Sequence, residues 1–122
     1  MTLQELYQNI GGDYEQAIRI LRMEKLLDKH IRKFTKNNVI ENLLAAGQTL
    51  DPTALFETAH AAKGVSANLG LKDLADAAGE ITEEFRPGHP RSLSDDEVRA
   101  KLEKIAARYS EITEGISAYE NA

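Results

Sequence analysis

The feature that most constrains this chain is a long run of apolar residues at helical spacing near its C-terminus. Seven apolar side chains recur every three or four residues: Val98, Leu102, Ile105, Tyr109, Ile112, Ile116 and Tyr119. This spacing places all of them on one face of a single helix. Their burial would contribute on the order of 10–20 kcal/mol before ordering entropy opposes it. A helix of this kind therefore needs apolar partners along its full length.

Other segments with the same periodicity can supply those partners. The predicted helices cover residues 36–47, 51–69, 71–86 and 94–119. Ser94 and Glu97 form a capping-box pattern at the start of the last one. Gly47 is expected to end the first helix, and Gly70 allows a tight reversal after the second. No segment shows the alternation of a β-strand.

The first 35 residues have the signals of shorter helices. Thr2 and Glu5 form another capping-box pattern, and Asp13 is a suitable N-cap for a second segment. The sequence allows a break near Arg22 and Met23 but does not require one.

These patterns together predict an all-α fold. We expect an antiparallel four-helix bundle over residues 36–119, with accessory N-terminal helices over residues 1–35 that cover one end or flank of it. A chain of 122 residues suffices for one domain with its own core, so a single domain over residues 1–122 is expected.

Composition excludes several classes of function. The net charge of −5 argues against a protein that binds nucleic acid. The sequence has no apolar run of about 18 residues and no signal-peptide pattern, so we expect a cytoplasmic protein without membrane contact. Because there is no cysteine and no His/carboxylate motif at ligand spacing, we expect no metal site. We also expect no bound cofactor.

The helix predicted over residues 51–69 has the most informative sequence. Asp51 is a suitable N-cap and Pro52 fits the first helical position. Its buried stripe is expected to consist of Leu55, Ala59, Ala62, Ser66 and Leu69. For Ser66 we expect a packing role, with its hydroxyl bonded to a preceding carbonyl.

The solvent side of this helix carries an unusual set of residues. At about 100° per residue, His60, Gly64 and Ala67 fall outside the buried stripe, and Lys63 lies three residues after the histidine. Glycine inside a helix costs about 1 kcal/mol relative to alanine. Gly64 is therefore explained by close approach of another molecule, by close helix packing, or by a neutral substitution.

His60-x-x-Lys63-Gly64-x-Ser66-x-x-Leu69-Gly70 resembles the signature of histidine-containing phosphotransfer (HPt) domains, and the chain looks like the free-standing bacterial type of this family. The resemblance is strongest over residues 51–86, and the family also folds as a four-helix bundle with accessory helices. It implies that His60 accepts a phosphoryl group on its outer ring nitrogen. It also implies that Lys63 approaches that group and stabilises its charge.

The resemblance also implies partners. These would be receiver domains of response regulators or hybrid histidine kinases, which carry a phosphoaspartate and supply the magnesium. The sequence has no glycine-rich nucleotide loop, so we expect a phosphoryl carrier in two-component signalling rather than an enzyme with its own kinase domain. We expect it to act as a monomer, since the apolar stripes are accounted for within one bundle.

Residues around His60 are candidates for docking such a partner: Gly64, Ala67, Phe56, Glu57, Ala61 and Asn68. Phe56 is either part of the core or part of an apolar docking patch. Glu57 either orients the imidazole through a hydrogen bond or is an ordinary exposed carboxylate. Ala61, Ala67 and Asn68 are small enough to let a partner lie flush.

The sequence leaves three functions open. In the leading one, His60 accepts a phosphoryl group from one receiver and passes it to another in a phosphorelay. In the second, a helical adaptor binds signalling partners through the same face without being phosphorylated. In the third, a histidine kinase phosphorylates the domain directly.

Overall fold

The computed structural model describes residues 1–121, and these contain seven α-helices and no strand. The predicted all-α class is therefore confirmed. The helices are α1 (Leu3–Ile10), α2 (Tyr14–Leu21), α3 (Glu24–Phe34), α4 (Val39–Thr49), α5 (Pro52–Asn68), α6 (Lys72–Glu84) and α7 (Asp95–Glu120). Ala122, the last residue of the predicted domain, lies outside the described residues.

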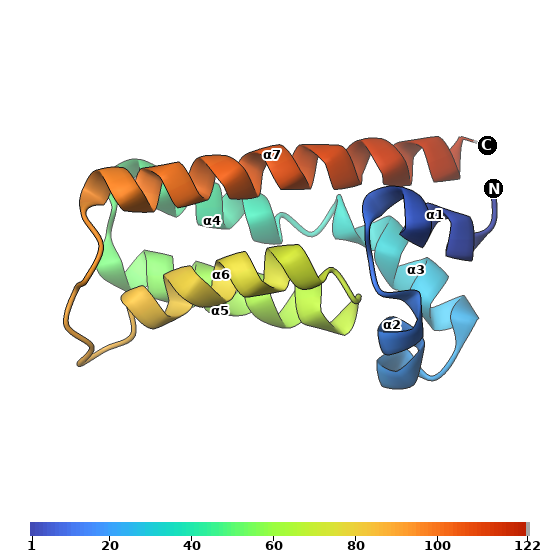
Figure 1. Cartoon of the computed structure of the whole chain (residues 1–122), viewed down its shortest axis with the longest axis horizontal. Helices are drawn as coiled ribbons and strands as arrows, with labels where there is room; N and C mark the ends of the chain where they lie inside the picture. The colour runs from blue at the N-terminus through green and yellow to red at the C-terminus, as the bar shows by residue number, and fades with distance from the viewer. Residues whose placement is uncertain (122) are drawn as a thin grey trace.

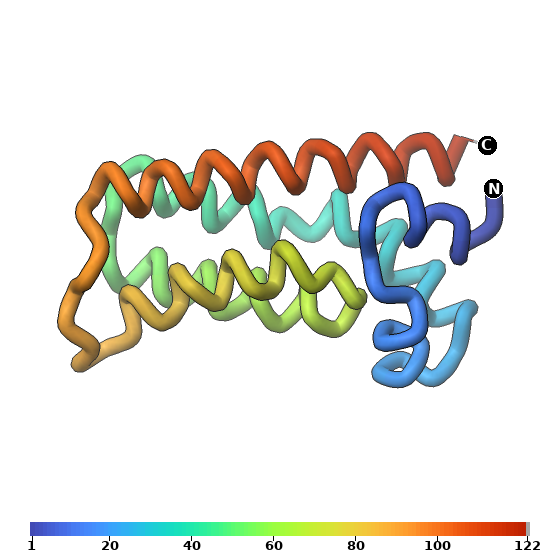
Figure 2. Tube along the Cα trace, in the orientation of Figure 1, coloured from blue at the N-terminus to red at the C-terminus, as the bar shows by residue number. Residues whose placement is uncertain are grey.

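Helices α4 to α7 form the predicted antiparallel bundle. Figure 1 shows α7 running the full length of the molecule, beside α4 and above α5 and α6. Helices α1, α2 and α3 gather at one end, where α1 and α3 pack on α7 and α2 packs on α5. The trace in Figure 2 shows that both termini lie at this end. The N-terminal helices are thus accessory to the bundle, as expected.

The apolar stripe of α7 contributes to the core along the length of the helix. Val98, Leu102, Ile105, Ile112 and Ile116 are buried, whereas Tyr109 and Tyr119 are half-buried. The two tyrosine hydroxyls reach polar partners at the surface: Tyr109 donates to Glu41 at 2.9 Å, and Tyr119 donates to Asp28. Each tyrosine therefore buries its ring while satisfying its polar end.

The boundaries of α4 differ from the prediction. The helix begins at Val39 rather than 36 and ends at Thr49, and Leu50 is its left-handed C-cap with φ 55°. Gly47 does not end the helix. It lies where α4 crosses α7, and a Cβ at that position would overlap the Leu102 side chain. The glycine serves close helix packing, which sequence alone did not distinguish from a stop signal.

A tight joint fixes the N-terminal helices to the end of α5. Gly70 has φ 69°, and its carbonyl accepts a hydrogen bond from the Asp13 backbone N–H at 2.8 Å. The buried Tyr7 hydroxyl donates to the Leu69 carbonyl at 2.6 Å. Any Cβ at position 70 would overlap the Asp13 carbonyl oxygen, so only glycine allows this approach.

Local signals set several of the other helix ends as expected. Both capping boxes are formed, at Thr2–Glu5 and at Ser94–Glu97. The break that the sequence allowed is present, since α2 ends at Leu21 and α3 begins at Glu24. None of the helices in residues 1–121 combines the length and the apolar character needed to cross a membrane.

Candidate functional site

His60 projects from the solvent side of α5, near the middle of this helix. Its neighbours Ala59 and Ala62 are fully buried and hold the helix on the bundle, while the imidazole is exposed. The other residues predicted for this face, which are Glu57, Ala61, Lys63, Gly64, Ala67 and Asn68, are also exposed. The structure thus brings them onto one surface, and their roles stay predictions.

Phe56 connects the imidazole to the neighbouring helix end. Its ring is half-buried against the core and stacks on the His60 ring, with centroids 5.9 Å apart and planes 25° apart. The Arg86 guanidinium lies over the same phenyl ring, 5.4 Å from its centroid. Phe56 therefore belongs to the core edge and to the exposed surface at once, and its stacking restricts the orientations open to His60.

Arg86 is itself held in place. Its Nη2 and Nε atoms donate to the two carboxylate oxygens of Glu83 at 2.8 and 3.0 Å. This hydrogen bond lowers the pKa of Glu83, and the positive charge of Lys63 lowers it further. The paired guanidinium can thus rest on the phenyl ring without moving freely in solvent.

Lys63 lies across α6. Its side-chain carbons Cδ and Cε would be 3.6 and 3.7 Å from a Cβ at Gly79, which is ordinary van der Waals contact, so the lysine stem lies directly on the α6 backbone at this glycine. A shallow groove beside it is lined by the carboxylate residues Asp76, Glu80 and Glu83. Lys63 forms no ion pair within 4.0 Å inside residues 1–121, so its ammonium is available to an incoming anion.

The surface above Gly64 is open. A Cβ at this position would meet no atom within 4 Å, which rules out close helix packing as the reason for this glycine. Of the three explanations, approach by another molecule and a neutral substitution remain. Glu57 is exposed and makes no hydrogen bond to His60 in the described part of the chain, so of its two alternatives the structure favours an ordinary exposed carboxylate.

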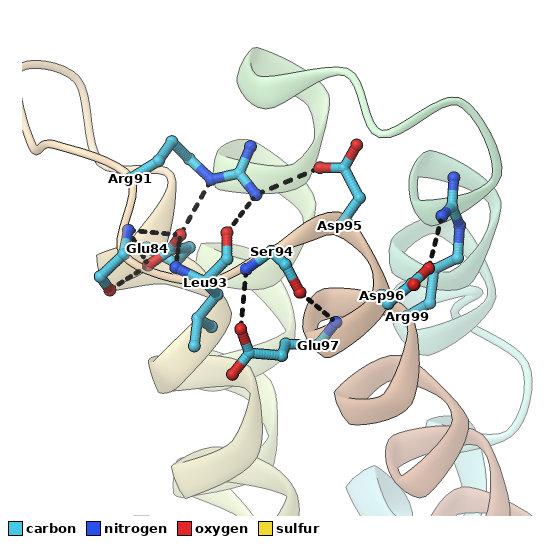
Figure 3. Close-up of polar contacts among 9 residues, drawn as sticks. Glu84, Arg91, Leu93, Ser94, Asp95, Asp96, Glu97 and Arg99 are labelled. Carbon is cyan, nitrogen blue, oxygen red and sulfur yellow. Dashed lines mark hydrogen bonds and ion pairs between the residues drawn. The ribbon is translucent and has the colours of Figure 1, made fainter.

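The α6–α7 loop is anchored beside this surface by a buried carboxylate, Glu84. Its oxygens accept hydrogen bonds from Arg91 Nε at 2.8 Å, Ser92 Oγ at 2.9 Å and the Leu93 backbone N–H at 2.9 Å. Figure 3 shows Glu84 between Arg91 and Leu93. Burial raises the pKa of the Glu84 carboxyl, but these hydrogen bonds outweigh burial and lower the pKa to about 2. The anchor holds the end of α6 from which Arg86 reaches Phe56.

The prediction for Ser66 is confirmed in one part and wrong in the other. Its side chain is fully buried, as the predicted packing role requires, but its hydroxyl has no hydrogen-bond partner within residues 1–121, so the predicted bond to a preceding carbonyl is absent. The Ser66 carbonyl instead accepts from the backbone N–H groups of Leu69 and Leu71, at 3.2 and 2.9 Å. Helix closure at this end of α5 therefore uses the Ser66 backbone and leaves its hydroxyl unpaired.

Sequence reasoning missed three residues of this region. Gly79 could have been found, because a glycine inside the predicted helix 71–86 is as costly as Gly64. Arg86 and Glu84 gave no such signal, since their partners come from another helix and from a returning loop. No cluster of three or more His, Asp or Glu side chains suited to a metal ion occurs in residues 1–121.

A comparison with models of protein families identifies the family. The family model described as "Hpt domain" matches residues 2–121, which is almost the whole chain. Searches of curated proteins and of solved structures found no significant match.

Proposed function

The chain belongs to the Hpt domain family, and from this premise we propose that it accepts a phosphoryl group on His60 from a receiver domain and passes it to another. Hpt domains act in histidine phosphotransfer and interact with receiver domains in two-component systems. The acceptor residue, its neighbours and the direction of transfer are our proposal.

One observation carries the proposal. His60 is an exposed imidazole on α5, with the Lys63 ammonium, unpaired within residues 1–121, three residues on and no side chain at Gly64. Phosphoryl transfer needs mainly positioning and charge stabilisation, because the transferring group is only loosely bonded in the transition state. A flat, open surface around the acceptor lets a second protein bring its phosphoaspartate within reach.

The step itself exchanges one bond for another. The lone pair of the outer nitrogen of neutral His60, Nε2, attacks phosphorus while the bond between phosphorus and the aspartate oxygen breaks. The aspartate leaves as a carboxylate, and the imidazole proton stays on Nδ1. The receiver supplies the magnesium, and Lys63 offsets the charge of the phosphoryl oxygens once they lie on His60. The reverse step on a second receiver completes the relay.

Phe56 supports this chemistry as a positioning residue. A ring stacked on the imidazole reduces the number of orientations that His60 must lose before attack. Arg86 adds a positive charge on the same side, but its carboxylate partner Glu83 keeps it at the phenyl ring. We therefore assign phosphoryl contact to Lys63 and leave Arg86 in a supporting role.

A labelling assay tests the proposal. The protein is mixed with a phosphorylated receiver domain and magnesium, and acid-labile, base-stable label is followed on three proteins: wild type, His60→Gln and His89→Gln. His89 lies exposed in the α6–α7 loop and serves as the matched histidine control. Label on wild type and His89→Gln, but not on His60→Gln, is the expected result. Tight binding without label would instead indicate an adaptor, and label only from a kinase with ATP would indicate direct phosphorylation.

A further inference from the structure

Positive charge is concentrated in one part of the chain. Residues 19–36 carry seven Lys or Arg residues and two acidic ones, whereas the rest of the chain carries eight and eighteen. A segment of net charge +5 is therefore attached to a body of net charge −10. In the structure this segment comprises the end of α2, the turn after it, and α3.

The same segment exposes large apolar side chains. Ile20, Met23 and Leu26 are 40, 53 and 37% exposed, and with Met1 they are the exposed large hydrophobic residues of the described chain. We call Ile20, Arg22, Met23 and Leu26 the hairpin tip. Exposed apolar side chains within a segment of net charge +5 distinguish this surface from the net acidic remainder of the chain.

The tip is poorly suited to local stability. Arg22 is in the left-handed region with φ 73°, where glycine would be unstrained. Met23 occupies the N-cap position of α3 and forms no side-chain cap bond, where serine or aspartate would supply one. Arg22 and Met23, two adjacent exposed residues, are thus each less favourable for local stability than another residue type would be. Positions where local rules fail in this way are expected at functional surfaces.

The surface around His60 borders α2, the helix that leads into the tip. Leu21, at the end of α2, lines one shallow groove together with Val65 and Asn68 of α5. Gln16 of α2 lines a second groove with Ala67. Asn68 lies about 12 Å along the helix axis from His60. Figure 1 shows α2 standing against the end of α5, where the Gly70–Asp13 joint fixes it.

We propose that the hairpin tip is a second docking contact for the receiver that exchanges phosphate with His60, and that this receiver presents an apolar patch bordered by carboxylates. The inference rests on the proposed function for the identity of its partner. A protein seated on His60 and Gly64 extends over Asn68 onto the tip, so both contacts are made at once.

Charge supports a protein partner over a membrane. The surface is basic over residues 19–36 and acidic along Asp76, Glu80 and Glu83 on α6. A partner with the opposite pattern is favoured in one orientation and opposed in the reversed one. An anionic membrane, by contrast, would attract residues 19–36 and repel the rest of the chain, which has a net charge of −10.

The double variant Arg22→Gly/Met23→Ser tests this inference, because it should improve the fold while weakening docking. We expect the Tm to rise by about 5 °C, since strain and a missing cap are both relieved. The KM for transfer from a phosphorylated receiver should rise about tenfold, with kcat unchanged, through loss of apolar contact and one charge. Lys104→Ala, on an exposed part of α7, is the control and should leave both values unchanged.

The probe is the phosphorylated receiver domain that labels wild-type protein fastest. Backbone amide shifts of the full chain, recorded with this receiver unphosphorylated, should change at Gly64 and also at Arg22 and Met23. An unchanged KM, or shifts at Gly64 without shifts at the tip, would overturn the inference and leave the proposed function standing.

Two other outcomes also count against it. Binding to phosphatidylserine vesicles that the double variant abolishes, with KM unchanged, would show that the tip serves a membrane instead. If no receiver labels His60 in the wild-type protein, the proposed function fails, and the receiver named here fails with it.

Discussion

Replacing Glu84 by glutamine tests how a single buried carboxylate holds the loop between α6 and α7. The side chain is nearly inaccessible and receives hydrogen bonds from Arg91, Ser92 and Leu93 (Figure 3). Glutamine has almost the same shape but no charge, and its amide N–H₂ would face donors. At least one of these bonds is therefore lost in the variant, and the Arg91 guanidinium loses its buried partner.

The expected size of the effect follows from the pKa of Glu84. Its fall from 4.5 to about 2 on folding corresponds to about 3 kcal/mol of stability, at about 1.4 kcal/mol for each tenfold change in the protonation equilibrium. Because glutamine keeps one acceptor oxygen, we expect Glu84→Gln to lower the free energy of unfolding by about 2–3 kcal/mol at pH 7.

The effect must depend on pH with a definite sign. The folded pKa of Glu84 lies below its unfolded value, so the stabilisation is complete above about pH 4.5 and is lost as the pH falls towards 2. Wild type and Glu84→Gln should therefore differ most at neutral pH and converge near pH 2.

Urea unfolding followed by circular dichroism at several pH values measures this difference. Glu103→Gln, an exposed residue on α7, is the matched control and should change stability by less than about 0.5 kcal/mol at any pH. A difference for Glu84→Gln that stays below about 1 kcal/mol, or that is the same at pH 3 and pH 7, would refute the electrostatic account of this loop.

Two further predictions concern α5. Gly64→Gln should slow transfer from a phosphorylated receiver about tenfold or more. It should raise the Tm slightly, because the site is open and glutamine is the better helix former. A transfer rate within twofold of wild type would leave Gly64 as a neutral substitution. Ser66→Ala should raise the free energy of unfolding by about 1 kcal/mol in urea titrations, since the buried hydroxyl has no hydrogen-bond partner. A loss of stability would mean that this hydroxyl is hydrogen-bonded in solution.

The features predictable from the sequence are those that arise within one helical turn. Thr2–Glu5 and Ser94–Glu97 each need only residues three positions apart, so their capping boxes are visible in the sequence. The exposure of His60 follows in the same way from the periodicity of its own helix.

Features that depend on another segment could not be predicted. Gly47 has the same local pattern whether it ends a helix or admits the Leu102 side chain, and only the crossing with α7 decides. The placement of Arg86 over Phe56 joins residues 30 positions apart, one on α5 and one just after the end of α6. Glu84 looks like one of many surface carboxylates until the loop returns to cover it.

The joint at Gly70 has a consequence for any shortened form of this protein. The Gly70 carbonyl bonds to Asp13, and the Leu69 carbonyl bonds to the buried Tyr7 hydroxyl. A fragment trimmed to α4–α7 would lose both donors at once and would uncover the apolar side chains of Leu69 and Leu71. Helices α1 and α2 thus hold the C-terminal end of α5, and removing them would make the helix that carries His60 less firmly fixed.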